Sequence, residues 1–381
     1  MLRYLFPLID PSANRWAFEA RLLRWLTLIW LFVGLIVLFS ASYVVADAER
    51  GDGMYYFKMQ LAWVFLGLTL FNALTHLPLR TILGVTPLAF VGVFLLIAAT
   101  IIPGVGVTVN GATRWLLIGP VGIQPSELIK PLLVLQSAQI FGSWHRLRLG
   151  TRLGWIGFFI LVTGCILMQP NLSTAALCGL VVWCIALASG LPLKYISGAA
   201  LSGFTVAVLS IGLREYQLRR MISFLNPWES PTGDGYQLVQ SLLAIGSGGL
   251  WGTGLGFSYQ KLFYLPIQYT DFIFSVFAEE FGFIGALFLL LLLLLYATVG
   301  LRIALKATSP FHQLVAIGAV LLLIGQSILN IGVAVGVLPT TGLPFPLMSY
   351  GGSSMVGSLA VAGLLVRTAR ESCGAEVVAL S

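Results

Sequence analysis

Charged residues are scarce in this sequence. Asp, Glu, Lys and Arg together make up 9% of the 381 residues, whereas hydrophobic residues make up 58%. A soluble domain carries about 25% charged residues, so a water-soluble fold is excluded because it could not bury this much apolar surface. Histidine and cysteine are also rare, with three and four copies. The histidines fall in different connecting segments and three cysteines fall in apolar runs, so no zinc site, haem site or disulfide framework is predicted.

Long apolar runs fill most of the chain instead. Segments of about 20 apolar residues cross a bilayer as helices, because the backbone must satisfy its own hydrogen bonds in hydrocarbon. The runs predict an all-α polytopic membrane protein in which residues 1–381 form a single transmembrane domain. Ten spans are predicted, at residues 26–46, 57–75, 81–102, 128–143, 154–168, 173–189, 194–213, 272–299, 313–337 and 349–366.

The distribution of basic residues predicts the orientation. Ten spans would place both termini on one side, and that side collects thirteen of the 21 Lys and Arg residues. Because cytoplasmic loops carry the excess of basic residues, we expect residues 1–25 and the tail 367–381 to be cytoplasmic. The net charge of +7 is therefore explained by membrane topology, and no nucleic-acid binding is predicted.

The connection at residues 214–271 is much longer than the others and lies on the predicted outer side. A structureless loop of that length is unusual unless it is functional, so we expect it to be an extracytoplasmic catalytic loop. Within it, YQLVQSLLAIGSGG has helical spacing but is too short to span, which indicates a re-entrant or interfacial helix. GTGLG, residues 252–256, lacks the strand, Lys and Ser/Thr of a phosphate-binding loop; we interpret it as glycines that let the backbone pack closely.

Basic side chains gather in the same loop. Arg214, Arg219 and Arg220 follow the seventh span, and Lys261 precedes the eighth. They could simply be solvated or contact anionic lipid headgroups, or they could bind phosphate on a lipid substrate, for which arginine offers bidentate geometry. These four residues, together with Gln240 of the short helix, are the candidates for substrate binding.

Acidic residues mark the eighth span. Asp271 stands where the helix is predicted to begin, so it is either a helix cap or a functional carboxylate. Glu279 shares its helical face with Asp271 and Ser275, about 12 Å deeper. Ionisable residues inside a span are costly and by default face protein or water at a functional site. The sequence therefore predicts a polar stripe that runs inward from the membrane surface.

A second charged pair begins the fourth span, in QPSELIK. Glu127 and Lys130 are three residues apart, which allows an ion pair on one helical face. The pair either neutralises itself or supports a nearby cavity.

Seven stretches of the chain carry a resemblance to a known family: NGATRW (110–115), QPSELIK (124–130), QPNLSTA (169–175), YQLRRMISFLNPW (216–228), GYQLVQSLLAIGSGGLWGTGLG (235–256), TDFIF (270–274) and LPTTGLPFPLMSYGGSS (338–354). In this order they resemble the SEDS family of bacterial shape, elongation, division and sporulation proteins. LNPW and GLGFSYQKLFYLP favour the division branch over the elongation branch. The chain departs from the family in two places. Ile267 and Tyr269 stand where many relatives have a glutamate and a histidine just before TDFIF, and Asn171 stands where an aspartate is common.

The resemblance implies a peptidoglycan glycosyltransferase in the bacterial cytoplasmic membrane. Such an enzyme polymerises lipid II into glycan strands at the outer face during septal synthesis and cell division, and releases undecaprenyl pyrophosphate. The resemblance also implies that Asp271 is catalytic and that Glu127 and Lys130 form a supporting ion pair. Implied partners are a class B penicillin-binding protein, other division proteins and membrane lipid. No cofactor is implied with certainty, and a divalent cation, Mg²⁺ or Mn²⁺, stays open.

Three alternatives remain at the level of sequence. The chain could be an elongation-type polymerase, or a lipid II flippase in which Glu279 and Glu280 act as relay groups. It could also be a scaffold without catalytic activity that recruits division proteins. A flippase should concentrate polar residues at the bilayer midplane, whereas here they crowd the predicted outer surface.

Overall fold

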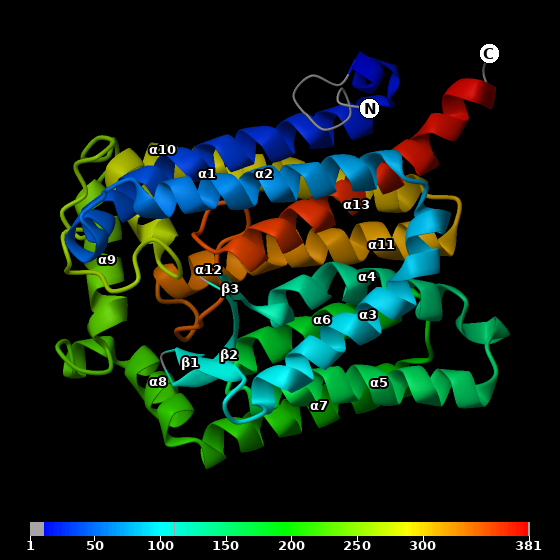
Figure 1. The fold of residues 1–381 in the computed structure, drawn as a ribbon, viewed down its shortest axis with the longest axis horizontal. Helices are drawn as coiled ribbons and strands as arrows, with labels where there is room; N and C mark the ends of the chain where they lie inside the picture. The colour runs from blue at the N-terminus through cyan, green and yellow to red at the C-terminus, as the bar shows by residue number, and fades with distance from the viewer. Residues whose placement is uncertain (1–10, 110, 120, 380–381) are drawn as a thin grey trace.

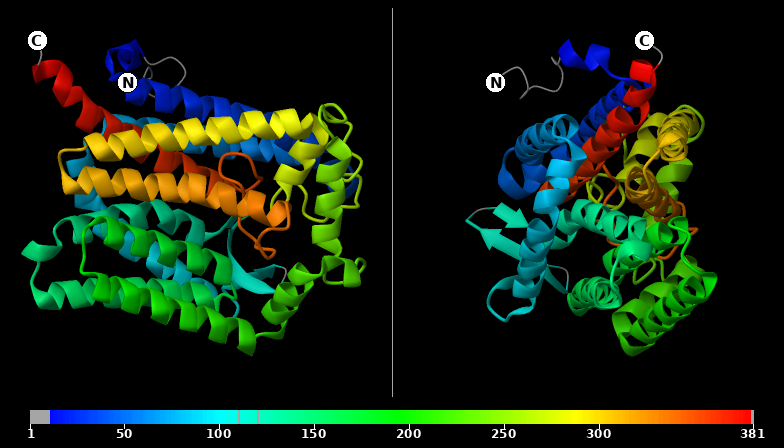
Figure 2. Two further views of the ribbon diagram at one scale, coloured as in Figure 1. Left: turned by 180° about the vertical axis from the view of Figure 1, so that it is seen from behind. Right: turned by 90° about the vertical axis from the view of Figure 1, so that its right-hand side faces the viewer.

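Long helices run side by side in a computed structural model that describes residues 11–109, 111–119 and 121–379 (Figure 1). Helix α1 begins and helix α13 ends at the same end of the bundle, and α10 begins at the opposite end, here called the Asp271 end (Figures 1 and 2). The helices are α1 (Phe18–Arg50), α2 (Tyr55–His76), α3 (Leu79–Ile101), α4 (Pro125–Gly142), α5 (Leu149–Met168), α6 (Leu172–Ala188), α7 (Leu193–Leu213), α8 (Glu215–Leu225), α9 (Tyr236–Gly248), α10 (Ile273–Lys306), α11 (Pro310–Val320), α12 (Gln326–Ala334) and α13 (Gly352–Ala379).

Eight helical segments in the described ranges are long and apolar enough to cross a membrane. They confirm the multi-pass helical fold. Helices α4 and α6, with 18 and 17 residues, lie in the same bundle but are not among the eight, so the count of ten spans stays a prediction. The predicted short helix is confirmed as α9, whereas α8 was not predicted because its charged sequence shows no long apolar run.

A three-stranded antiparallel sheet at the Asp271 end departs from the all-α prediction. Its strands are β1 (Gly106–Val109), β2 (Ala112–Ile118) and β3 (Val121–Ile123), paired in the order β1-β2-β3. An Asn-Gly pair between alternating residues is a hairpin signal, and Gly111 has a φ of 76° that suits such a turn. Asn110 itself lies outside the described residues.

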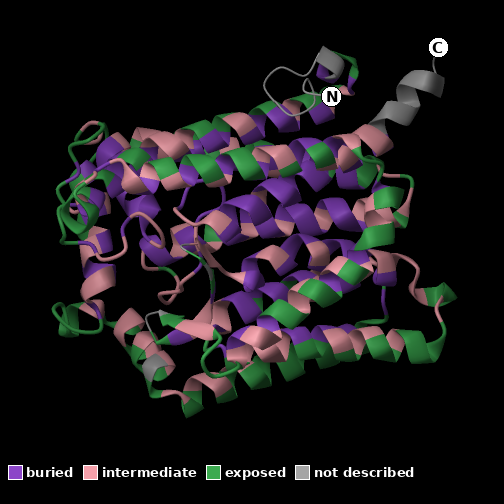
Figure 3. Ribbon diagram, viewed as in Figure 1, coloured by how far each residue is buried: buried purple, intermediate pink, exposed green. Residues whose placement is uncertain are grey.

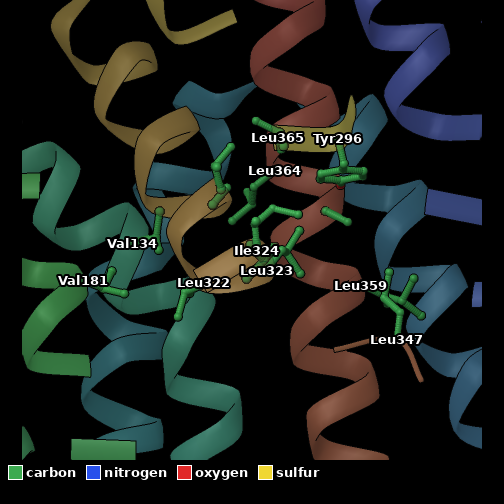
Figure 4. Close-up of a cluster of buried hydrophobic side chains, with 14 of the residues drawn as sticks. Val134, Val181, Tyr296, Leu322, Leu323, Ile324, Leu347, Leu359, Leu364 and Leu365 are labelled. Carbon is green, nitrogen blue, oxygen red and sulfur yellow. The ribbon is translucent and has the colours of Figure 1, made fainter. Parts of the chain in front are cut away.

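Buried residues gather in the centre of the bundle (Figure 3), and most of its helices contribute to one hydrophobic core. Figure 4 shows Leu323 and Ile324 near Leu364 of α13, whereas Leu322 lies on the side of Val134 of α4; these three residues belong to a π-helical turn, Leu321–Gly325, that joins α11 to α12. Helices α2 and α13 approach closely because Gly352 has no side chain, and a Cβ there would lie 2.1 Å from Trp63. Small residues at helix contacts allow such packing in membranes.

Helix α10 is broken at Gly282, which has a φ of 65°. The glycine-rich segment after α9 fills the break with backbone hydrogen bonds, so the polar groups freed by the break are satisfied, as hydrocarbon requires. A Cβ on Gly252 would lie 2.1 Å from the Glu280 carbonyl, which confirms that GTGLG serves close backbone packing. The bonds run from Thr253 N to Glu279 O (2.9 Å), Gly254 N to Glu280 O (3.0 Å), Phe283 N to Gly249 O (2.9 Å) and Ile284 N to Leu250 O (3.2 Å).

Candidate active site

Asp271 lies in the turn just before α10. The N-cap of that helix is Phe272, and no side chain caps it, so the interpretation of Asp271 as a helix cap is wrong. The side chain is partly buried, and its carboxylate accepts no hydrogen bond from the part of the chain that the structure describes. Burial raises the pKa of Asp271 to about 6, while the positive charges of Arg114 and Arg220 oppose that rise. A carboxyl group with this pKa exchanges a proton near neutral pH.

Arg114 is a site residue that the sequence analysis did not identify. It projects from β2 toward the loop that joins α12 to α13. A Cβ on Gly342 of that loop would lie 3.6 Å from Nη1 of Arg114 and 3.8 Å from Oδ2 of Asp271. The two charged groups therefore face each other across Gly342 without a direct ion pair. The Asn-Gly hairpin signal beside NGATRW could have placed Arg114 on a strand, but not next to Asp271.

The backbone around Asp271 is held by α12 and by the segment before α13. Asn330 of α12 donates from Nδ2 to the carbonyl oxygens of Asp271 (2.8 Å) and Leu343 (2.9 Å). Ser349 donates from Oγ to the Thr270 carbonyl at 2.5 Å. These bonds fix the position of the carboxylate relative to the loop that carries Gly342, and such fixed placement is what a catalytic group requires.

The predicted ion pair between Glu127 and Lys130 is present, at 2.7 Å, and both side chains are buried. Lys130 also donates to Oε1 of Gln326 at 3.0 Å, and Nε2 of Gln326 donates to the Pro344 carbonyl at 2.6 Å. The pair therefore connects through Gln326 to the same loop as Asn330. This connection favours a supporting role over simple mutual neutralisation.

The structure separates the predicted arginines. Arg220 lies close enough to Asp271 to lower its pKa and donates to the Thr340 carbonyl at 3.3 Å. Arg214 instead donates to the Leu167 carbonyl at 3.0 Å. Arg219 is exposed and forms an ion pair with Glu215 at 2.5 Å. Of the three, Arg220 is the one that the structure brings to Asp271.

Lys261 does not have the environment expected of a substrate-binding residue. Its side chain is buried, 4% exposed, and its ammonium group donates to Glu280 and to Ser40 of α1, both at 2.8 Å. Two of the three donors of the ammonium group are therefore engaged within the protein, which favours a structural role for Lys261, and its role in substrate binding stays a prediction. Gln240 is partly buried on α9, and its side chain makes no hydrogen bond within the described ranges, so its role stays a prediction.

Glu279 and Ser275 do not continue a polar path from Asp271. The hydroxyl of Ser275 lies 2.6 Å from that of Ser241 on α9. Glu279 is 1% exposed, and its carboxylate anchors the segment after the glycine-rich turn. Its donors are Ser258 Oγ at 2.5 Å, Tyr259 N at 2.8 Å and Gln260 N at 3.4 Å.

The described side chains around Asp271 do not form a metal site. Among the described residues, no group of three or more His, Cys, Asp or Glu side chains could hold a metal ion. Asp271 is thus a single carboxylate with cationic neighbours. That donor set does not fit a resident divalent cation, because such ions take several oxygen ligands.

Comparisons with known proteins agree on one family. A family described as "Cell cycle protein", covering FtsW, RodA and SpoVE, matches residues 20–373. A probable peptidoglycan glycosyltransferase FtsW of Synechocystis sp. is 55% identical over 100% of this chain and 96% of its own length. A putative peptidoglycan glycosyltransferase FtsW of Mesostigma viride is 51% identical over 97% of this chain and 88% of its own. Stage V sporulation protein E of Bacillus subtilis is 37% identical over 91% of this chain and 96% of its own.

Solved structures show the same fold. A chain of a peptidoglycan synthase complex superposes with a TM-score of 0.72 at 29% identity, covering 92% of this chain and 97% of that one. The rod shape determining protein RodA of Thermus thermophilus superposes with a TM-score of 0.66 at 29% identity, covering 92% and 96%. The chain therefore belongs to the FtsW, RodA and SpoVE family of cell cycle proteins.

Proposed function

We propose that this protein is a peptidoglycan glycosyltransferase of the division branch, which polymerises lipid II into glycan strands. Relatives named FtsW peptidoglycan glycosyltransferases at 48% to 55% identity support the proposal. The sporulation relative, at 37% identity, is about as similar to this chain as FtsW relatives of other bacteria at 37% to 39%, so the division branch is supported by the names of the relatives at 48% to 55%.

The observation that carries the proposal is the environment of Asp271. A base works best when its pKa lies near the working pH, and a positioned base contributes about 10² to 10⁴ in rate. The pKa of about 6 and the absence of hydrogen-bond donors in the described chain leave the Asp271 carboxylate able to take a proton. Glu279 lacks this property because backbone and hydroxyl donors already occupy its oxygens.

The reaction needs one such base. Asp271 removes the proton of the acceptor sugar hydroxyl as its oxygen bonds to the anomeric carbon of the donor. The bond from that carbon to the diphosphate oxygen breaks, and the electron pair leaves with undecaprenyl pyrophosphate. A single displacement converts the α-linked donor into a β-linked polymer, as in other inverting sugar transfers. Arg220 would stabilise negative charge on the diphosphate.

The setting follows from this chemistry. Lipid II presents its sugars at the outer face of the cytoplasmic membrane, so the Asp271 end is outward and both termini are cytoplasmic. The septum is the expected location of a division enzyme. The solved peptidoglycan synthase complex supports a class B penicillin-binding protein as partner.

The flippase alternative receives less support. It needs Glu279 and Glu280 as exchangeable relay groups, but Glu279 is saturated and Glu280 forms a buried ion pair with Lys261 at 2.8 Å.

Purified protein supplied with lipid II tests the proposal. The Asp271→Asn variant should lose at least about 10²-fold in polymerisation rate, whereas Asp234→Asn, the same change at an exposed site of the outer segment, should retain the wild-type rate. Product length and rate are measured on gels, with any required transpeptidase partner present in every reaction. Unchanged polymerisation by Asp271→Asn would remove this residue from the mechanism.

A further inference from the structure

Arg114 and Asp271 face the same point beside Gly342 without contacting each other. Both Nη atoms of Arg114 (3.6 and 3.8 Å) and Oδ2 of Asp271 (3.8 Å) surround the point where a side chain on Gly342 would begin. Arg114 and Asp271 form no direct ion pair. In the described part of the chain the guanidinium of Arg114 donates no hydrogen bond, and its Nε is buried without a partner. A partly buried cation with unused donors is costly, so this arrangement suits a ligand that is anionic.

The position of Arg114 is fixed by the fold. Residues 112–118 form the central strand of the sheet, and its register pairs Trp115 with Val107 and Leu116 with Ile123. The opposite wall of the space is the segment around Gly342, where Asn330 holds Leu343 and Gln326 holds Pro344. Neither wall depends on a ligand for its position, and preorganised donors of this kind bind developing charge without reorganisation.

We propose that Arg114 is a substrate-binding residue that receives the diphosphate of the lipid-linked donor sugar, and that Gly342 keeps the space between Arg114 and Asp271 open for the reacting groups. The inference rests on the proposed function. Arg114 donates to the phosphate oxygens as the anomeric carbon-oxygen bond breaks, while Asp271 takes the hydroxyl proton of the acceptor. The planar guanidinium matches a phosphate with two parallel hydrogen bonds, which an ammonium group cannot do.

Gly342 offers a test that leaves the fold intact. It has no positive φ, and the nearest atoms to an added Cβ lie at 3.6 to 3.8 Å, which is ordinary van der Waals contact. A methyl group therefore fits sterically but occupies the space between the base and the cation. Gly246, on α9, has nothing within 4 Å of an added Cβ and provides a matched control.

The first experiment measures the binding of inorganic pyrophosphate by calorimetry, in nanodiscs of neutral phosphatidylcholine. The Asp271→Asn protein should bind it, and adding Arg114→Gln should weaken binding about tenfold or more. Arg50→Gln, at an exposed arginine of the same end of the bundle, should not. Equal binding with and without Arg114 overturns the proposal. Loss of binding when the discs contain anionic phosphatidylglycerol also overturns it, because Arg114 would then be a headgroup site.

The second experiment uses polymerisation of lipid II. Gly342→Ala should reduce the rate about tenfold or more with an unchanged melting midpoint, and Gly246→Ala should not. The positive charge of Arg114 lowers the pKa of Asp271. Arg114→Gln should therefore move the acid limb of the pH-rate profile to higher pH. Arg114→Lys should return the acid limb to its wild-type position, but the rate should stay below that of the wild type. A wild-type rate in Gly342→Ala, or an acid limb that stays in place in Arg114→Gln, overturns the proposal. Failure of the proposed function is a separate result, since it would appear as polymerisation by Asp271→Asn.

Discussion

Two carboxylates eight residues apart show how environment separates structure from chemistry. Glu279 lies inside α10, 1% exposed, and accepts hydrogen bonds from Ser258, Tyr259 and Gln260. Asp271 lies just before α10, partly buried, with no donor to its carboxylate in the described chain and with arginine charges nearby. On sequence the two acids share a helical face and look alike.

The difference lies in the donors around each group. Hydrogen bonds to the charged form of a carboxylate favour that form and fix it, whereas burial without donors raises the pKa. A saturated carboxylate therefore anchors the chain, and an unsaturated one can exchange a proton. The same distinction separates Lys261, which is paired and buried, from Arg114, whose buried Nε has no hydrogen-bond partner in the described chain.

Among the comparisons of Asp271 with Glu279, the largest effect is expected when the Asp271 carboxylate is displaced by one methylene group. Asp271→Glu displaces the oxygens by about one carbon-carbon bond, and a misplacement near 1 Å costs about 10² in rate. Initial rates of lipid II polymerisation measure the loss, with Asp234→Glu as control. A wild-type rate would show that the position of this carboxylate is unimportant, and the comparison with Glu279 would lose its basis.

Replacing Glu279 should lower the stability of the protein before it affects the chemistry. Glu279→Gln removes charge-assisted hydrogen bonds to Ser258 and Tyr259, and bonds of this kind contribute about 1.5 to 3 kcal/mol. The melting midpoint of the purified protein should fall by several degrees, and proteases should cut more readily within residues 249–264. Glu215→Gln, at an exposed surface ion pair, should leave the midpoint nearly unchanged. If Glu279→Gln melts like the wild type but has lost its rate, Glu279 has a chemical role.

The change of the polymerisation rate with pH should be the smallest of the three effects. The pKa of Asp271 is raised to about 6 by burial, so the base is ionised above that pH and becomes protonated below it. The rate should be flat above about pH 7 and should fall about tenfold for each pH unit below 6. Initial rates between pH 5 and 8 measure the profile, and Asp234→Asn should reproduce it. A rate that rises as the pH falls would contradict a base with this pKa.

Much of the fold follows from local sequence. Apolar runs long enough to cross a membrane identify most spans, and the short apolar helix of the outer segment was found as α9. Helix α8 and the sheet were not predicted, because short elements have weak local signals and depend on tertiary contacts. The Asn-Gly pair before Ala112 was the one usable signal for the hairpin.

The site was predictable only in part. Short stretches of sequence were enough to predict Asp271 and the ion pair of Glu127 with Lys130, because each depends on a single helix. Arg114 and Lys261 could not, because their partners are far away in sequence: Asp271 is 157 residues from Arg114, and Glu280 and Ser40 lie on separate helices from Lys261.

The sequence by itself determined that the chain is a helical membrane protein and where its notable acids and bases stand, because apolar length and helical spacing are local properties. Only the tertiary structure decided which of those charged groups have hydrogen-bond partners and which have none in the described chain. The physical reason is that burial and hydrogen bonding arise between segments that meet only in the folded bundle, and these contacts set whether a carboxylate anchors the chain or accepts a proton.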